Sequence, residues 1–75
     1  MRVHITLDKE IRSDGGAMQS KLEEIRSVAA LRDVNETRFH RYGVISADVP
    51  ETSVDRIKDV SGVKSVEADE IRHAI

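Results

Sequence analysis

Three histidines, His4, His40 and His73, are the side chains of this chain best suited to holding a metal ion. Structural metal sites need ligands at short, recurring spacings, and often thiolates among them. The histidines are widely separated in the sequence, and the chain has no cysteine. We therefore expect separate, solvent-facing histidines and no metal or other cofactor.

Hydrolytic chemistry would require a serine or another nucleophile held beside a base. Serine, histidine and aspartate all occur, but no segment resembles a nucleophile elbow. A chain of 75 residues is expected to form one small domain that buries only about 60% of its unfolded surface. Few residues are then left to build the walls of a catalytic cavity, so we expect a single non-enzymatic domain over residues 1–75.

Charge and aromatic content indicate which partners to exclude. The chain has 12 basic and 14 acidic residues, a net charge of −2, which argues against neutralisation of nucleic-acid phosphates. The only aromatic residues, Phe39 and Tyr42, are three apart on an expected strand and would point to opposite faces, unlike a base-stacking platform. The apolar stretch after Met1 is too short for a signal peptide or a membrane span. We expect neither nucleic acid nor membrane as a partner, and a cytoplasmic location if Met1 is the native start.

The elements that must position any binding side chains follow from the hydrophobic period. Val3, Ile5 and Leu7 alternate with polar residues, which predicts a half-buried strand, and a loop is expected from Asp8 to Gly16. From Ala17 the apolar period becomes helical, and this helix is expected to end between Ala30 and Asp33. Its buried face is given by the apolar residues Met18, Leu22, Ile25 and Val28 or Ala29.

The second half of the chain repeats the order of strands and helix. Residues 34–42 include Thr, Phe and Tyr, which favour an edge strand, and residues 44–49 alternate as another strand. Pro50 indicates the start of a second helix, in which Thr52 and Asp55 are spaced as in a capping box. Residues 63–68 form the last expected strand, followed by a polar tail.

The order strand, helix, strand, strand, helix, strand predicts an α+β fold of the ferredoxin-like, split βαβ type (βαββαβ). In this fold a four-stranded antiparallel sheet carries both helices on one face. The other face would be open to a partner. The residues expected on it are small or polar, namely His4, Thr6, Val44, Ser46 and Asp48.

The C-terminal segment resembles that of a known family. Val66-Glu67-Ala68-Asp69 follows a hydrophobic strand, and His73-Ala74 precedes the last residue. This pattern, together with Val49-Pro50-Glu51 before a helix, resembles the propeptide-like inhibitors formed by the pro-domains of subtilisin-like serine proteases. The resemblance is specific from about Tyr42 onward, and residues 1–41 match in pattern only.

The resemblance implies a mode of binding. In this family the open sheet face lies against two surface helices of the protease, and the first and last acids of a Glu-x-Asp motif reach the N-termini of those helices. By position these acids are Glu67 and Asp69. A carboxylate there accepts otherwise unpaired backbone N–H groups and meets the positive end of the helix dipole.

The tail, residues 70–75, is implied to lie extended in the substrate cleft, as a cleaved product would. Arg72, His73, Ala74 and Ile75 would occupy the four subsites leading to the catalytic serine. The sequence departs from the family pattern in Arg72, where an apolar residue is usual, and in β-branched Ile75. Ala68 also replaces the usual middle acid, while Ile71 offers an apolar contact one residue further out.

The resemblance therefore implies a propeptide-like inhibitor of a subtilisin-family serine protease, monomeric when free, either as a stand-alone inhibitor or as an intramolecular chaperone. Its predicted protease-binding residues are Glu67, Asp69, Ile71, Arg72, His73, Ala74 and Ile75. The alternative is a ferredoxin-like regulatory or oligomerisation domain whose sheet face pairs with another copy.

Overall fold

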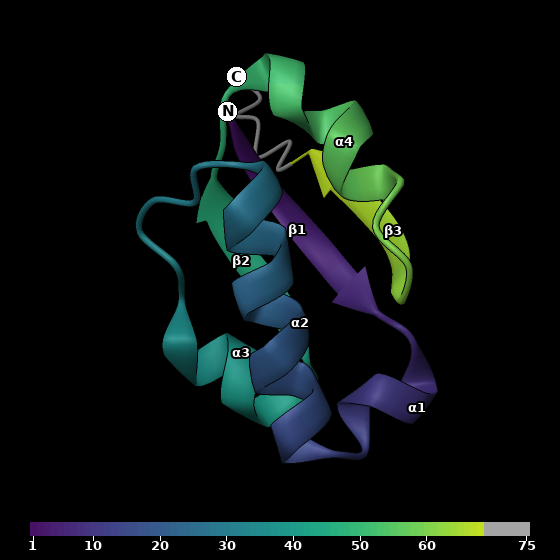
Figure 1. Cartoon of the computed structure of the whole chain (residues 1–75). Coiled ribbons are helices and arrows are strands. Elements are labelled where there is room, and N and C mark those ends of the chain that lie inside the picture. The colour runs from purple at the N-terminus through teal and green to yellow at the C-terminus, as the bar shows by residue number, and fades with distance from the viewer. Residues whose placement is uncertain (69–75) are drawn as a thin grey trace.

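The computed structural model of the chain describes residues 1–68. Its three strands form one sheet, and helices connect them along the chain (Figure 1). The elements are, in order, β1 (Arg2–Leu7), α1 (Lys9–Arg12), α2 (Gly15–Val28), α3 (Glu36–Tyr42), β2 (Val44–Asp48), the short 3₁₀ helix η1 (Glu51–Ser53), α4 (Val54–Lys58) and β3 (Val63–Ala68).

The sheet is antiparallel with the order β2-β1-β3, so β1 is its central strand. The α+β class agrees with the sequence, but the predicted four-stranded ferredoxin-like sheet is wrong. Within residues 1–68 the sheet has three strands, because the segment expected to be the fourth, residues 34–42, contains the helix α3 instead.

Both ends of α3 are fixed by local chemistry. The side chain of Asn35 accepts a hydrogen bond from the backbone N–H of Arg38 at 2.9 Å, as an N-cap does. At the other end Gly43 has a φ of 68°, the left-handed conformation that terminates helices. Phe39 turns into the core and is 2% exposed. Capping and burial of one aromatic side chain outweigh the strand preference of Thr37, Phe39 and Tyr42.

The chain before α3 covers the outer edge of β2. Arg32 and Asp48 exchange two backbone hydrogen bonds, of 2.9 and 2.8 Å, and the Asn35 N–H donates to the Ser46 carbonyl at 2.9 Å. These bonds satisfy backbone groups of β2 that a fourth strand would otherwise pair. The edge of the sheet on this side is therefore closed by a short irregular segment.

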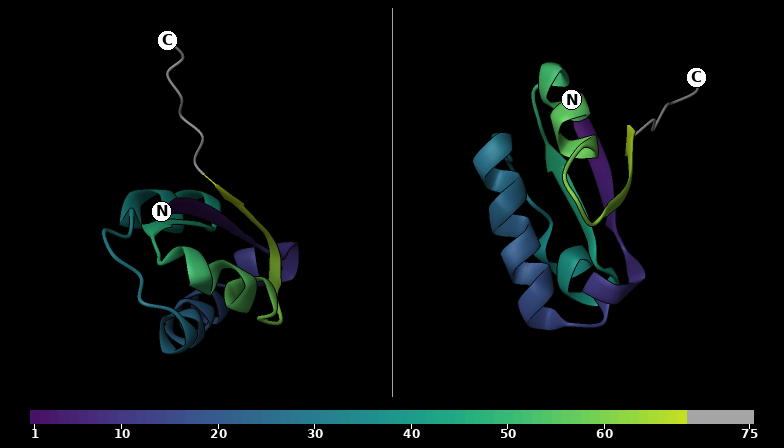
Figure 2. Two further views of the ribbon diagram at one scale, coloured as in Figure 1. Left: turned by 90° about the horizontal axis from the view of Figure 1, so that it is seen from above. Right: turned by 45° about the vertical axis from the view of Figure 1, so that its right-hand side comes forward.

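The core lies between one face of the sheet and the helices α2 and α4, which cover the same side of the sheet (Figure 2). α3 lies beside β2 (Figure 1). Alternate residues of β1 and β2 meet the α2 face that the helical period predicts, which confirms Met18, Leu22, Ile25 and Ala29 as core positions. The buried apolar side chains of the described residues are Val3, Ile5, Leu7, Met18, Leu22, Ile25, Ala29, Phe39, Ile45, Ala47, Val49, Ile57 and Val60.

Three features of the helices differ from the expected ones. Helix α2 ends at Val28, with Ala29 as its extended C-cap, and not between Ala30 and Asp33. The expected loop after β1 contains the short helix α1, and α2 begins at Gly15 because the Asp14 carboxylate accepts from the Gly16 and Ala17 N–H groups. The capping box expected at Thr52 and Asp55 is not formed, since Thr52 lies inside η1, the 3₁₀ helix that begins after Pro50.

Candidate functional site

The sheet face turned away from α2 and α4 is the surface that the sequence predicts to bind a partner. His4 sits in the middle of it, opposite Ser46 on β2 and opposite Glu67 on β3. Thr6 lies in the next row, between Val44 and Ser65. Strand β1 alternates as predicted: Val3, Ile5 and Leu7 are buried in the core, and the residues between them are half-buried on this face.

A polar cluster of His4, Ser46 and Arg38 organises the β2 half of the face. The His4 Nδ1 and the Ser46 Oγ are 2.7 Å apart, and the Arg38 Nη1 donates to the same oxygen at 3.4 Å. Ser46 is only 1% exposed. The sequence predicts His4 as a solvent-facing residue, but it is half-buried and hydrogen-bonded to Ser46. The β2 half of the face is thus partly covered.

The other end of the face has an exposed ion pair. Arg2 Nη1 lies 3.6 Å from Asp48 Oδ2, and both side chains remain substantially solvated. Ion pairs in such surroundings contribute between about 0 and 1 kcal/mol to stability. This pair orients two charged side chains at the rim of the sheet and adds little to the free energy of folding.

A shallow hollow of about 470 Å³ runs across this face. It is lined by His4, Arg38, Tyr42, Val44 and Glu67. Arg38 and Tyr42 belong to α3, and the sequence did not predict either as a site residue because their segment was expected to be a strand. The residues that could have indicated a helix here, and so the positions of Arg38 and Tyr42, are its two caps, Asn35 and Gly43. We call this hollow, defined by its five lining residues, the face hollow.

Glu67 is the only predicted protease-binding residue that lies within the described part of the chain. Its carboxylate is on the open face, in an exposed position at the end of β3, and Ala68 beside it is also exposed. The other predicted residues are outside residues 1–68, and they are Asp69, Ile71, Arg72, His73, Ala74 and Ile75.

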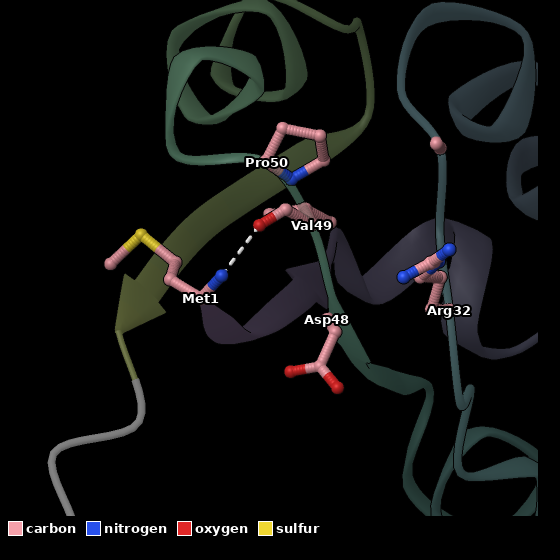
Figure 3. Close-up of a pocket in the computed structure, with 6 residues that line it drawn as sticks. Met1, Arg32, Asp48, Val49 and Pro50 are labelled. Carbon is pink, nitrogen blue, oxygen red and sulfur yellow. Dashed lines mark hydrogen bonds between the residues drawn. The ribbon is translucent and has the colours of Figure 1, made fainter.

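A second hollow, of about 410 Å³, lies at the opposite end of the sheet (Figure 3). It is lined by Met1, Ala30, Arg32, Asp48, Val49 and Pro50. Two of its charged groups already have partners. The Met1 amino group donates to the Val49 carbonyl at 2.7 Å, and Asp48 pairs with Arg2. We therefore interpret this hollow as a result of the way β1 and β2 pair at the end of the sheet, and not as a binding site.

Three further properties bear on the class of site. Among residues 1–68, no group of three His, Cys, Asp or Glu side chains is placed to hold a metal ion. His40 is exposed on α3 and stacks in a tilted arrangement with Phe39, ring centres 5.2 Å apart. No helix in the described part of the chain is long and apolar enough to cross a membrane.

Comparison of the chain with protein-family models, curated protein sequences and solved structures finds no significant match.

Proposed function

We propose that the chain is a non-catalytic inhibitor of a subtilisin-like serine protease, which binds through the open sheet face and the C-terminal tail. The observation that carries this proposal is Glu67, an exposed carboxylate on the open face at the end of β3, directly before the tail in the sequence. The rest of the motif, Val66-Glu67-Ala68-Asp69 and His73-Ala74, supports it by resemblance.

The chemistry asked of Glu67 is simple. A carboxylate that meets the N-terminus of a partner's helix accepts N–H groups that have no partner inside that helix. Each such contact contributes about 0.5–2 kcal/mol. Residues two apart in an extended backbone point to the same side, so the proposal has Glu67 and Asp69 bind two neighbouring helix N-termini of the protease.

The face on which Glu67 lies supports docking on its β1–β3 half. Thr6 and Ser65 are small, uncharged and paired across these two strands, so a partner helix can approach the backbone closely there. On the β2 half, Arg38 and Tyr42 of α3 rise beside the sheet and line the face hollow. We therefore propose that the protease surface lies against β1 and β3, with α3 as a rim.

The tail supplies the inhibitory contact in this proposal. An extended segment laid along a protease cleft adds a strand to the enzyme, main-chain hydrogen bonds give affinity, and side-chain pockets give selectivity. Small Ala74 suits a narrow second subsite, while Arg72 and Ile75 select among proteases. No cavity in the chain itself is required, because the cleft belongs to the partner.

Titration of the full chain against a subtilisin with a chromogenic peptide substrate tests the proposal. We expect stoichiometric inhibition that is lost when residues 72–75 are deleted. The double variant Glu67→Ala with Asp69→Ala should weaken inhibition and leave the circular dichroism spectrum and the unfolding midpoint unchanged. Glu23→Ala is the matched control, since Glu23 is an exposed acid on α2, away from the open face.

Absence of inhibition at micromolar concentration across several subtilisin-like proteases would refute the proposal. If the double variant inhibits as strongly as the native chain, the tail alone accounts for inhibition. The two acids, and with them the sheet face, would then have no part in binding.

The alternative that the sequence leaves open, an oligomerisation domain that pairs through its sheet face, makes a different prediction. Sedimentation equilibrium should then show dimers, and a Thr6→Glu substitution in the middle of the face should dissociate them. The inhibitor proposal expects a monomer in the same experiment.

A further inference from the structure

The outer edge of β3 has a geometry that the inhibitor proposal does not use. Antiparallel pairs alternate between residues that exchange both backbone hydrogen bonds and residues that exchange none. Met1 and Val49 exchange both bonds, of 2.7 and 2.8 Å. By this alternation the odd-numbered residues of β1 bond to β2, and the even-numbered residues, His4 and Thr6, bond to β3.

The same alternation fixes which backbone groups of β3 point outward. Glu67 lies opposite His4 and Ser65 opposite Thr6, so their N–H and C=O groups face β1. The N–H and C=O groups of Val66 and Ala68 therefore point away from the sheet. No other strand of residues 1–68 pairs with this edge, since the sheet order ends at β3. The edge is a template for one more strand.

Helix α4 packs beside β3 (Figure 2, right). A hollow of about 310 Å³ lies against both elements. It is lined by Lys58 of α4 and by Val63, Lys64, Ser65 and Val66 of β3. Lys64 is the residue left without a partner where the β1–β3 register shifts between Ser65 and Val63. The two charged residues that line the hollow are both lysines, in a chain whose net charge is −2. Lys64 also borders a neighbouring hollow that is lined by Asp8, Lys9 and Glu10, so the excess of positive charge is confined to the hollow beside α4.

We propose that this edge binds an extended segment of a partner protein as a fourth, added strand, with an acidic side chain of that segment seated between Lys58 and Lys64. Main-chain hydrogen bonds to Val66 and Ala68 give the affinity, and the two lysines select the acid. Side chains of the added strand alternate between the faces of the sheet, so its α4-side positions meet the hollow.

A second copy of this chain fits the edge less well. Val66 and Ala68 lie opposite Ile5 and Val3, so they share the α4 side, and neither is acidic, while Glu67 points to the opposite face. Pairing two β3 strands would offer no carboxylate to either hollow and would bring the lysines of both copies together. The charges therefore favour a different, acidic partner.

Fluorescence anisotropy with a labelled model peptide tests this proposal on the full chain. The probe is Thr-Val-Thr-Val-Glu-Val-Thr-Val-Thr, and its match carries lysine in place of the glutamate. We expect the acidic peptide to bind about tenfold more tightly than the lysine peptide, from two partly solvated charge pairs. Amide resonances of Val66 and Ala68 should shift on binding.

Variants of the hollow separate charge from strand addition. Lys58→Glu with Lys64→Glu should reverse the preference between the two peptides, and Arg26→Glu, an exposed charge reversal on α2, should leave it unchanged. Ala68→Pro removes one outward N–H and should abolish binding of both peptides. If this variant fails to fold, the acidic peptide methylated at its edge-facing amides makes the same test on the native chain, and it should not bind.

Three outcomes would overturn the proposal. They are no binding of either peptide, equal binding of both, and binding without resonance shifts in β3. Concentration-dependent self-association that shifts β3 resonances in the absence of peptide would assign the edge to a second copy instead. Because the open face and the edge are different surfaces, none of these outcomes decides whether the chain inhibits a protease.

Discussion

The side-chain oxygen of Asn35 accepts a hydrogen bond from the backbone N–H of Arg38 at 2.9 Å, and this contact starts the helix that stands beside the sheet. Replacing Asn35 with alanine removes that acceptor. We expect the free energy of unfolding to fall by about 1 kcal/mol, measured by urea denaturation. Asn35→Ser should recover most of the loss, and equal destabilisation by both variants would contradict the capping role.

Alanine substitutions at two glycines, Gly43 and Gly15, test the backbone conformation that each position requires. Gly43 has a positive φ, and a Cβ there would collide with the side chain of Arg12. Gly43→Ala should therefore destabilise the chain by at least about 1 kcal/mol. Gly15→Ala should stabilise it by about 0.4–1 kcal/mol, since nothing lies within 4 Å of the added atom. Thermal unfolding followed by circular dichroism distinguishes the two, and a neutral Gly43→Ala would disprove the left-handed cap.

Phe39 and Tyr42 should differ sharply in their contribution to stability. Phe39 is 2% exposed and Tyr42 is 59% exposed, although they lie three residues apart on one helix. Phe39→Ala should cost about 3–5 kcal/mol, which is enough to unfold a domain of this size. Tyr42→Ala should change stability by no more than about 0.5 kcal/mol. If Phe39→Ala does not fold, the milder Phe39→Leu still allows the loss of stability to be measured. Equal losses of stability at positions 39 and 42 would contradict the orientation of α3, in which Phe39 is buried and Tyr42 is exposed.

A charge placed on the β1–β3 half of the open face should block protease docking. Ser65 lies opposite Thr6 on this face. Ser65→Lys puts a long cation where a partner helix would approach, and we expect the inhibition constant to rise about tenfold or more. Ser20→Lys on the exposed side of α2 is the matched control. Unchanged inhibition by Ser65→Lys would show that the face is not buried in the complex.

The parts of the fold that were predictable are those with a strong hydrophobic period. Val3, Ile5 and Leu7 define β1, and the apolar face of α2 is equally regular, so burial of one side decides both elements. Helix α3 was not predictable in this way. It has seven residues and a single buried side chain, Phe39, and is too short to show a period. Its only local signals are its caps, Asn35 and Gly43, which the strand preference of its aromatic residues obscured.

The site was predictable to the same extent as the strands. Alternation places Glu67 and His4 on one face, and the register brings them opposite each other. The contribution of Arg38 and Tyr42 was missed because it depends on α3. The hydrogen bond between His4 and Ser46 depends on strands that are distant in sequence, and no local pattern records such a pairing.

The backbone bonds from Arg32 and Asn35 to β2 have a consequence for assembly. They occupy both backbone groups of Asp48 and the Ser46 carbonyl, so the β2 side of the sheet offers no continuous template for another strand. A sheet that can accept a strand on one side only cannot propagate, because each addition consumes its single growing end. Within residues 1–68, the covered β2 edge therefore opposes the open-ended stacking of sheets that leads to fibres.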